Sequence, residues 1–175
     1  MSKKTILITF LAVAILGICS YAYLGGFHEV KISKVSIGSY KIAGKHFKGK
    51  VQSDSLGNIF FEAKKYVETH DAAKSIAILY YKGADNSIAI IDCFVGALLQ
   101  SNTENLPDEF KLKEIQVKEV LRARFEGHRL VTPDPKTMYE KIKTYANANN
   151  ISLQEIYIEK YFSDEGIEVD YFIVD

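Results

Sequence analysis

The chain has 175 residues, 47% of them hydrophobic, which is enough for one domain with its own core and a short appendage. Lys and Arg number 22, and Asp and Glu also number 22, so the charge balance argues against a nucleic-acid partner and against a disordered acidic tail. The two cysteines, Cys19 and Cys93, lie far apart, so neither a disulfide framework nor a zinc site is expected, and we predict no metal and no cofactor.

The first element is an uncharged apolar segment from Ile6 to Leu24. As a helix it rises about 28 Å, close to the roughly 30 Å hydrocarbon core of a bilayer. Lys3 and Lys4 precede it, so the positive-inside tendency places the N-terminus in the cytoplasm and the rest of the chain outside. Lys31 weakens this assignment because it adds positive charge on the other side.

These features predict two parts. Residues 1–26 form a single-pass membrane anchor that contacts the lipid bilayer through residues 6–24, with Gly25-Gly26 as a flexible exit, and residues 27–175 form an extracytoplasmic domain. A cleavable signal peptide is the alternative, since Ser20 and Ala22 have the spacing that a signal peptidase accepts, and the domain would then be secreted or periplasmic.

A repeat is predicted in the domain, because a shift of 78 residues aligns several short segments without a gap. The aligned positions are Phe47-Lys48-Gly49 with Phe125-Glu126-Gly127, Phe61-Glu62 with Tyr139-Glu140, Lys65 with Lys143, and Ile78 with Ile156. The alternative is chance similarity between two ordinary amphipathic units.

The first half, about residues 30–100, begins with a predicted strand over residues 31–47. A helix capped by Asp54 and ending near His70 follows. Two strands over residues 76–81 and 87–99 come next, and the polar segment between them has the composition of a hairpin turn.

The second half, about residues 108–175, has the same order. Residues 110–125 are extended, and Asp134-Pro135 supplies a helix N-cap followed by proline at the first helical position. The helix places Met138, Ile142 and Tyr145 on one face and ends over residues 147–150. Strands over residues 155–162 and 168–174 close the chain, joined by a turn over residues 163–166.

The predicted fold class is therefore α+β. Two strand-helix-strand-strand units pair about a pseudo-twofold axis, with antiparallel sheets and two helices, behind one N-terminal transmembrane helix. A groove between the two halves is the natural place for a ligand.

The domain resembles the GyrI-like small-molecule-binding domains, also called the bacterial transcription-activator effector-binding fold. The resemblance extends from Val30 to the C-terminus and depends on the order and spacing of five segments. These are Val35-Ser36-Ile37-Gly38-Ser39-Tyr40, Phe47-Lys48-Gly49, Ile78-Leu79-Tyr80-Tyr81, Asp92 to Gly96, and Glu159-Lys160-Tyr161.

The resemblance implies a central groove that binds amphipathic, often cationic, aromatic compounds through a buried glutamate, which by position is Glu159. The sequence departs from the family at Lys50-Val51, where a Pro-aromatic pair is usual, and it contains no tryptophan. The resemblance also implies a second class of function, because some members of the wider family resemble hydrolases that use a groove glutamate as general base.

Alternation along the strand that contains Glu159 places Tyr157 and Tyr161 on the same face. The 78-residue shift places Tyr81 opposite Glu159, and Tyr40 is the remaining candidate for the pocket. A partly buried carboxylate among aromatic rings either takes a raised pKa or binds a cation. The alternative is that Glu159 hydrogen-bonds Tyr81 or Tyr40 and only stiffens the core.

We therefore expect a membrane-tethered module that binds a small amphipathic or cationic molecule, or a protein partner, in this groove. A hydrolase of electrophilic small molecules that acts through Glu159 is the first alternative, and a scaffold without ligand is the second. No Ser/His/Asp or Cys/His set accompanies Glu159, so a binding role is favoured over an enzyme. The sequence leaves the natural ligand and the oligomeric state open.

Overall fold

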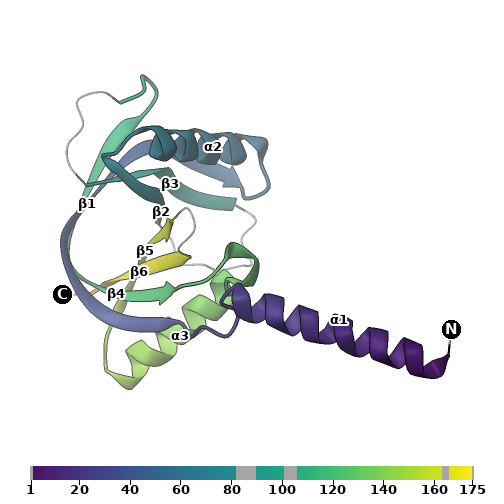
Figure 1. The fold of residues 1–175 in the computed structure, drawn as a ribbon. Coiled ribbons are helices and arrows are strands. Elements are labelled where there is room, and N and C mark those ends of the chain that lie inside the picture. Colours follow the sequence, from purple (N-terminus) through teal and green to yellow (C-terminus); the bar gives the residue numbers. More distant parts are fainter. Residues whose placement is uncertain (1, 82–89, 101–105, 163–165, 175) are drawn as a thin grey trace.

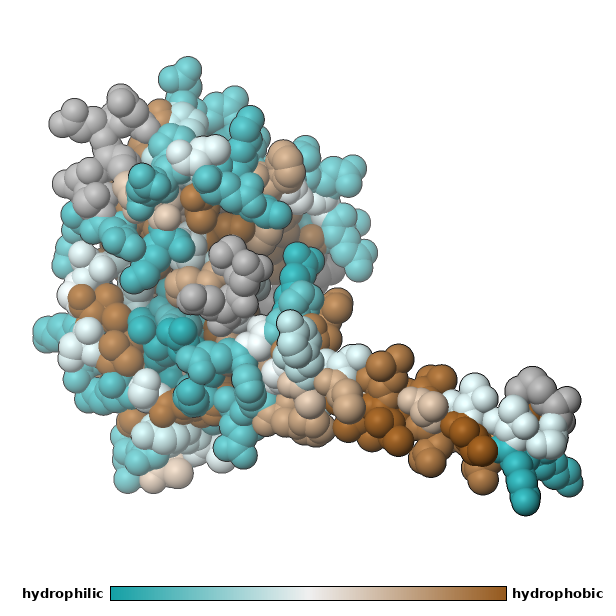
Figure 2. Space-filling view, in the orientation of Figure 1, coloured by the Kyte–Doolittle hydropathy of each residue, from teal (hydrophilic) through white to brown (hydrophobic). Residues whose placement is uncertain are grey.

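The structure is a computed structural model that describes residues 2–81, 90–100, 106–162 and 166–174. The first element is helix α1 (Lys3–Tyr23), which Ser2 caps by accepting a hydrogen bond from the Thr5 amide. None of its residues is buried, and it projects away from the rest of the molecule as an apolar rod with charged residues only at its far end (Figures 1 and 2). By length and composition α1 is able to cross a membrane, as is a signal sequence.

At the exit from α1, where the sequence predicts a flexible linker at Gly25-Gly26, the structure places a hydrogen-bonded turn, here called the elbow. Gly25 is buried with a positive φ of 81°, and its carbonyl accepts a hydrogen bond from the His28 amide. The His128 amide donates to the Leu24 carbonyl across 2.8 Å, which ties the end of α1 to the domain.

Six antiparallel strands form the body of the domain. Their bounds are β1 (Lys31–Lys50), β2 (Ala73–Tyr80), β3 (Ile90–Leu99), β4 (Lys111–Phe125), β5 (Leu153–Tyr161) and β6 (Ile167–Ile173). The hydrogen-bonded order is β1-β3-β2-β5-β6-β4, and β1 pairs again with β4, so the sheet closes into a barrel. The sequence predicts separate antiparallel sheets, whereas the structure joins all six described strands into one continuous sheet.

Two amphipathic helices cover the outside of the barrel on different sides (Figure 1). Helix α2 (Asp54–Thr69) starts at Ser53, whose side chain accepts from the Leu56 amide, so the cap lies one residue before the predicted Asp54. Helix α3 (Pro135–Ala148) starts at the predicted cap Asp134, whose carboxylate accepts from Thr137 across 2.9 Å. A short 3-10 turn, η1 (Arg129–Val131), connects β4 to α3.

The barrel has a different set of side chains on each side of its wall. The interior is filled from all six strands, by Tyr40, Ile42, Ala77, Leu79, Phe94, Val120, Ile158 and Phe172. Alternate residues face outward, where Met138, Ile142 and Ala146 of α3 pack on β4, β5 and β6, and Leu56, Ile59 and Phe60 of α2 pack on β2 and β3. Each strand thus contributes to two apolar layers.

The predicted α+β class and the predicted order of elements are confirmed. On α3 the third buried position is Ala146 and not Tyr145, which is exposed. The turn predicted over residues 82–86, and most of the turn predicted over residues 163–166, lie outside the described residues.

Candidate functional site

The candidate site is centred on Glu159 of β5, on the outer face of the barrel. Its strand neighbours are Ile78 of β2 and Val169 of β6, so its own row of the sheet is aliphatic. The side chain is 5% exposed, and the structure gives it no ion pair within the described residues. Its carboxylate is therefore desolvated without an ion-pair partner among the described residues.

Two tyrosines supply hydrogen bonds to this carboxylate. The Tyr161 hydroxyl donates to Oε2 of Glu159 across 2.6 Å, and the Tyr80 hydroxyl donates to the same oxygen across 3.3 Å. Tyr161 is the last residue of β5, and its ring contacts Phe60 of α2 edge-on at 5.9 Å. The carboxylate thus lies between the part of the sheet covered by α2 and the part covered by α3.

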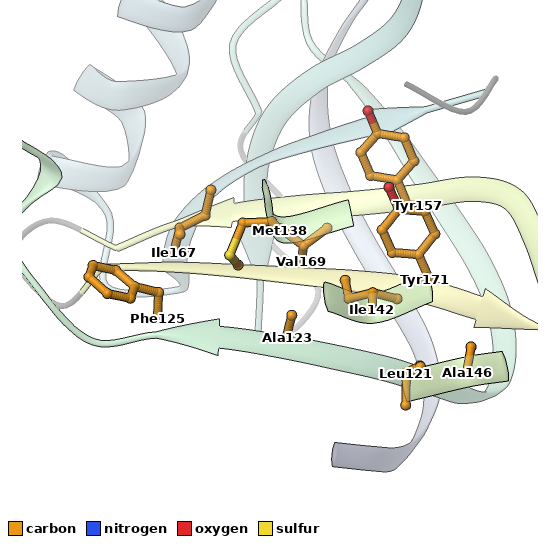
Figure 3. Close-up of a cluster of buried hydrophobic side chains, with 10 residues drawn as sticks. All are labelled: Leu121, Ala123, Phe125, Met138, Ile142, Ala146, Tyr157, Ile167, Val169 and Tyr171. Carbon is orange, nitrogen blue, oxygen red and sulfur yellow. The ribbon is translucent and has the colours of Figure 1, made fainter. Parts of the chain in front are cut away.

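Beside Glu159 runs a stack of three phenol rings, each from a different strand. The Tyr80 and Tyr157 ring centroids are 4.7 Å apart, and those of Tyr157 and Tyr171 are 4.8 Å apart, with interplanar angles of 13° and 12°. Figure 3 shows the Tyr157 and Tyr171 rings with their hydroxyl groups on the same side. The register causes the stack, because Tyr157 pairs with Tyr80 on one side and Tyr171 on the other.

A cavity of about 270 Å³ adjoins the carboxylate. Its floor is the outer face of β5 and β6, and its wall is the start of α3 with the connection that precedes it. The lining residues are Arg129, Thr132, Pro133, Asp134, Pro135, Met138, Tyr139, Tyr157, Glu159, Tyr161, Ile167, Val169 and Tyr171. The cavity is aromatic and aliphatic inside, with one cation and one carboxylate among the residues from the connection. All of its lining residues belong to the second half, so this cavity is not the groove predicted between the two halves.

Burial raises the pKa of Glu159, and the hydrogen bonds from Tyr161 and Tyr80 oppose this shift without cancelling it. Burial also raises the pKa of Tyr161 and of Tyr157, and the nearby Glu159 charge adds to both shifts. The tyrosines therefore remain hydrogen-bond donors at physiological pH, and the carboxylate holds its proton more tightly than an exposed glutamate does. Such a site gains from any ligand that brings a positive charge.

Three of the five predicted site residues come together: Glu159, Tyr157 and Tyr161 all line this cavity. Tyr81 does not face Glu159, because Ile78 pairs with Glu159 and Tyr80 pairs with Tyr157. Tyr81 instead packs against the barrel-interior cluster, where the ammonium of Lys113 lies 4.8 Å from its ring centroid. The 78-residue alignment is wrong for this strand.

Tyr40 is also remote from the cavity. It lies in the barrel interior, where its hydroxyl donates to Asp170 and its ring stacks on Phe172 with centroids 6.2 Å apart. The predicted hydrogen bonds from Tyr81 or Tyr40 to Glu159 are thus made by Tyr80 and Tyr161 instead. Burial raises the pKa of Tyr40, and the Asp170 charge adds to this.

Sequence reasoning did not identify Tyr80 and Tyr171 as neighbours of the carboxylate. Alternation separates Tyr80 from Tyr81 cleanly, because adjacent residues of a strand point to opposite faces. The register between β2 and β5 decides which of the two faces Glu159, and an error of one residue exchanges them. No local signal in the sequence fixes that register.

A second buried polar cluster, here called the ionic network, lies on the inner side of the same strands. The ammonium of Lys160 is 2.6 Å from both Asp170 and Glu168, and Arg122 makes a two-pronged contact with Asp170 at 2.8 and 2.9 Å. Arg124 binds Glu168 at 2.9 Å. Its charges are paired with one another, so the network serves to join β4, β5 and β6.

Within the described residues, no group of three or more His, Cys, Asp or Glu side chains is placed to hold a metal ion. His46, next to one Phe-x-Gly step, binds Asp92 across 2.7 Å. His128, next to the other, caps η1.

Solved structures share this fold. No protein-family model matches the chain, and no curated protein sequence matches it. The EcmrR C-terminal domain aligns with 85% of this chain and 99% of that domain, at a TM-score of 0.60 and 11% identity. EcmrR in its complex with DNA aligns with 98% of this chain and 68% of that one, at a TM-score of 0.58 and 12% identity.

A hydrolase from Listeria innocua aligns with 82% of this chain and 92% of its own, at a TM-score of 0.57 and 10% identity. At these identities the likeness concerns the fold alone. These neighbours are consistent with the GyrI-like effector-binding fold that the sequence predicts.

Proposed function

We propose that this protein is a membrane-tethered binding module that holds a small amphipathic cation in the cavity beside Glu159. The observation that carries the proposal is a buried carboxylate that has two phenol donors but no cationic partner within the described residues. A bound cation supplies the missing charge and offsets the desolvation of Glu159.

The surrounding rings favour the same ligand. Tyr139, Tyr161 and Tyr171 line the cavity, and a cation over an uncovered aromatic face gains about 0.5–2 kcal/mol. Both faces of the Tyr157 ring are covered by Tyr80 and Tyr171. The apolar floor accommodates the hydrophobic part of the molecule. Because the cation pairs with the ionised form of Glu159, binding releases a proton and tightens as pH rises.

The size of the cavity limits the ligand. At about 270 Å³ it lies just below the range of about 300–1,000 Å³ that is usual for drug-sized ligands. We therefore expect a molecule with one aromatic ring and a compact cationic head, and not a large polycyclic compound.

The tether is α1, and the positive charge at its start favours a domain outside the cytoplasm. We include no nucleic-acid partner in the proposal, because the chain has equal numbers of acidic and basic residues and so no net positive charge.

The order of elements supports duplication of the domain. The first half has the order β1-α2-β2-β3 and the second half has the order β4-α3-β5-β6. Exchanging the three strands of one half with those of the other leaves the barrel order unchanged.

The test uses benzyltrimethylammonium, which is small enough for the cavity, and its uncharged carbon isostere neopentylbenzene. We expect wild type to bind the cation more tightly than the isostere, and Glu159→Gln to lose at least about tenfold in affinity for the cation, or 1.4 kcal/mol. Glu155→Gln is the matched control, because Glu155 is exposed on the same strand. Equal cation affinity in wild type and Glu159→Gln would refute the proposal.

A hydrolase is the second candidate, and the short contact between Tyr161 and Glu159 favours it. A carboxylate with a raised pKa, 2.6 Å from a phenol, provides an acid-base pair inside a small apolar cavity. Styrene oxide fits the cavity and tests this candidate directly. Hydrolysis that disappears in Glu159→Gln but persists in Glu155→Gln would establish the enzyme, and its absence would rule out this epoxide as a substrate.

A further inference from the structure

The segment that is hydrogen-bonded to the end of α1 also forms part of the wall of the Glu159 cavity. The amide of His128 is hydrogen-bonded to Leu24, where α1 ends. The next residue, Arg129, already lines the cavity, and Thr132 and Asp134 follow it there. The four residue steps from His128 to Thr132 span at most about 14 Å, so this part of the cavity wall lies within about that distance of the residue bonded to the end of α1.

Two glycines bring the elbow and this connection close together. Gly25 and Gly127 approach so closely that a Cβ on Gly25 would lie 3.1 Å from the Cα of Gly127. A Cβ on Gly127 would in turn lie 3.2 Å from the Leu24 carbonyl. Figure 1 shows α1 leaving the domain beside the connection between β4 and α3. The two glycines therefore allow the end of α1 to pack closely against the connection that lines the cavity.

Exposed apolar side chains gather at the same place. Leu130, in the middle of η1, is 78% exposed, and Tyr23 at the end of α1 is 91% exposed. Phe27, just after the elbow, is 67% exposed. Tyrosine is typical of membrane-water interfaces, and an exposed leucine next to Arg129 suits the headgroup boundary.

We infer that the Glu159 cavity opens at the lipid headgroup layer, with Leu130 inserted beside α1, so that amphipathic ligands reach Glu159 from the membrane and not from bulk water. The inference depends on the proposed tether and deepens the proposed ligand class: the ligand is a molecule that partitions into the bilayer. The exposed side chains of Leu130, Tyr23 and Phe27 contact the lipid headgroup layer, because they lie next to the end of the predicted membrane span.

The absence of tryptophan from the sequence allows a direct test with single-tryptophan variants of the full chain in phosphatidylcholine vesicles. Leu130→Trp probes the inferred contact. Phe10→Trp, within α1, is the inserted control. Leu112→Trp is the water-exposed control, because Leu112 is exposed at the end of β4 opposite to the elbow.

Lipids brominated close to the headgroup should quench Phe10→Trp weakly and Leu130→Trp about twofold, since interfacial side chains lie about 5–10 Å into the boundary. Lipids brominated near the bilayer centre should quench Phe10→Trp more than Leu130→Trp, and Leu112→Trp should respond to neither. Quenching of Leu130→Trp no stronger than that of Leu112→Trp would overturn the inference. So would a Phe10→Trp signal that no lipid quenches, because α1 would then not span.

Ligand uptake gives the second readout. Benzyldimethyloctylammonium carries a benzylammonium head of the expected size on an octyl chain that stays in the lipid. When it is loaded into the vesicles, its binding rate should be lower in Leu130→Asp than in Leu112→Asp, while both variants bind benzyltrimethylammonium in detergent as wild type does. Equal uptake rates would overturn the inferred route. If cation binding in detergent depends on Glu159 but Leu130 contacts no lipid, the proposed function stands and only the membrane route fails.

Discussion

Tyr161 donates a 2.6 Å hydrogen bond to Glu159 two residues earlier on the same strand, and this contact joins the two outward-facing side chains at the centre of the cavity. Side chains two apart on a strand lie on one face, so the pair is formed by local geometry. The pair becomes chemically significant because the fold removes it from water.

The first prediction concerns the pH dependence of stability. Burial raises the folded-state pKa of Glu159 above its usual 4.5, so its contribution to stability is fully present below pH 4.5 and declines as pH rises through the folded-state pKa. Glu159→Gln stays neutral and avoids this decline. The free energy of unfolding of Glu159→Gln relative to wild type should therefore increase with pH, by up to about 1.4 kcal/mol for each unit of pKa shift.

Thermal unfolding of the ligand-free protein between pH 4 and pH 8 measures this difference, where 1 kcal/mol corresponds to about 2–4 °C in Tm. Glu155→Gln should follow wild type throughout. A constant offset between Glu159→Gln and wild type would contradict the raised pKa.

The second prediction separates the two phenol donors. Tyr161→Phe removes the shorter bond and should cost about 1.5–3 kcal/mol at pH 8, where Glu159 is more fully ionised. Tyr80→Phe removes a 3.3 Å bond and should cost less than about 1 kcal/mol. Urea unfolding at pH 5 and pH 8 compares them, and equal costs at both pH values would count against this assignment.

The third prediction concerns the ionic network. Lys160→Met leaves Asp170 and Glu168 without their shared ammonium inside the barrel, and it should destabilise the protein by about 3–5 kcal/mol. Lys64→Met, which removes a 3.7 Å surface pair with Glu68, should change stability by less than about 0.5 kcal/mol. Chemical denaturation of both variants tests this, and similar costs for the two lysines would show that the network contributes little.

The same network predicts the behaviour in acid. Burial alone raises the pKa of Asp170, but hydrogen bonding to Arg122 and the charge of Lys160 outweigh burial and lower it below its usual 3.8. Its contribution to stability is thus present above pH 3.8 and is lost as pH falls through the lowered pKa. Asp170→Asn should therefore be less stable than wild type at pH 6 and should lose that disadvantage as pH falls below 3.8 through the lowered pKa.

The fourth prediction tests the closest approach of β1 and β3. Gly44 pairs with Gly96, and a Cβ on Gly96 would lie 2.1 Å from the Ala43 carbonyl oxygen. Gly96→Ala should therefore cost at least about 1–3 kcal/mol through backbone displacement. Gly57→Ala is the matched control, because nothing lies within 4 Å of its Cβ and it is inside α2, where alanine should stabilise by about 0.5–1 kcal/mol. Thermal unfolding should move in opposite directions for the two variants.

Local features of the fold were accessible from the sequence because they depend on neighbours along the chain. The apolar period of α3, the cap at Asp134 and the alternation of Tyr157, Glu159 and Tyr161 all involve residues within a few positions of one another. The length of the uncharged segment predicted α1 for the same reason. Glu159 itself came from the resemblance to a family, and the structure places it in a cavity.

Contacts between strands were decided only by the tertiary structure. The joining of six strands into one barrel, the choice of Tyr80 over Tyr81 as the partner of Glu159, and the burial of Tyr40 against Asp170 all depend on register. Register depends on which residues pack best across distant segments, and two candidates one position apart have the same local pattern. The sequence determined which side chains share a face of each strand, and the packing of the whole barrel determined which of those faces meet.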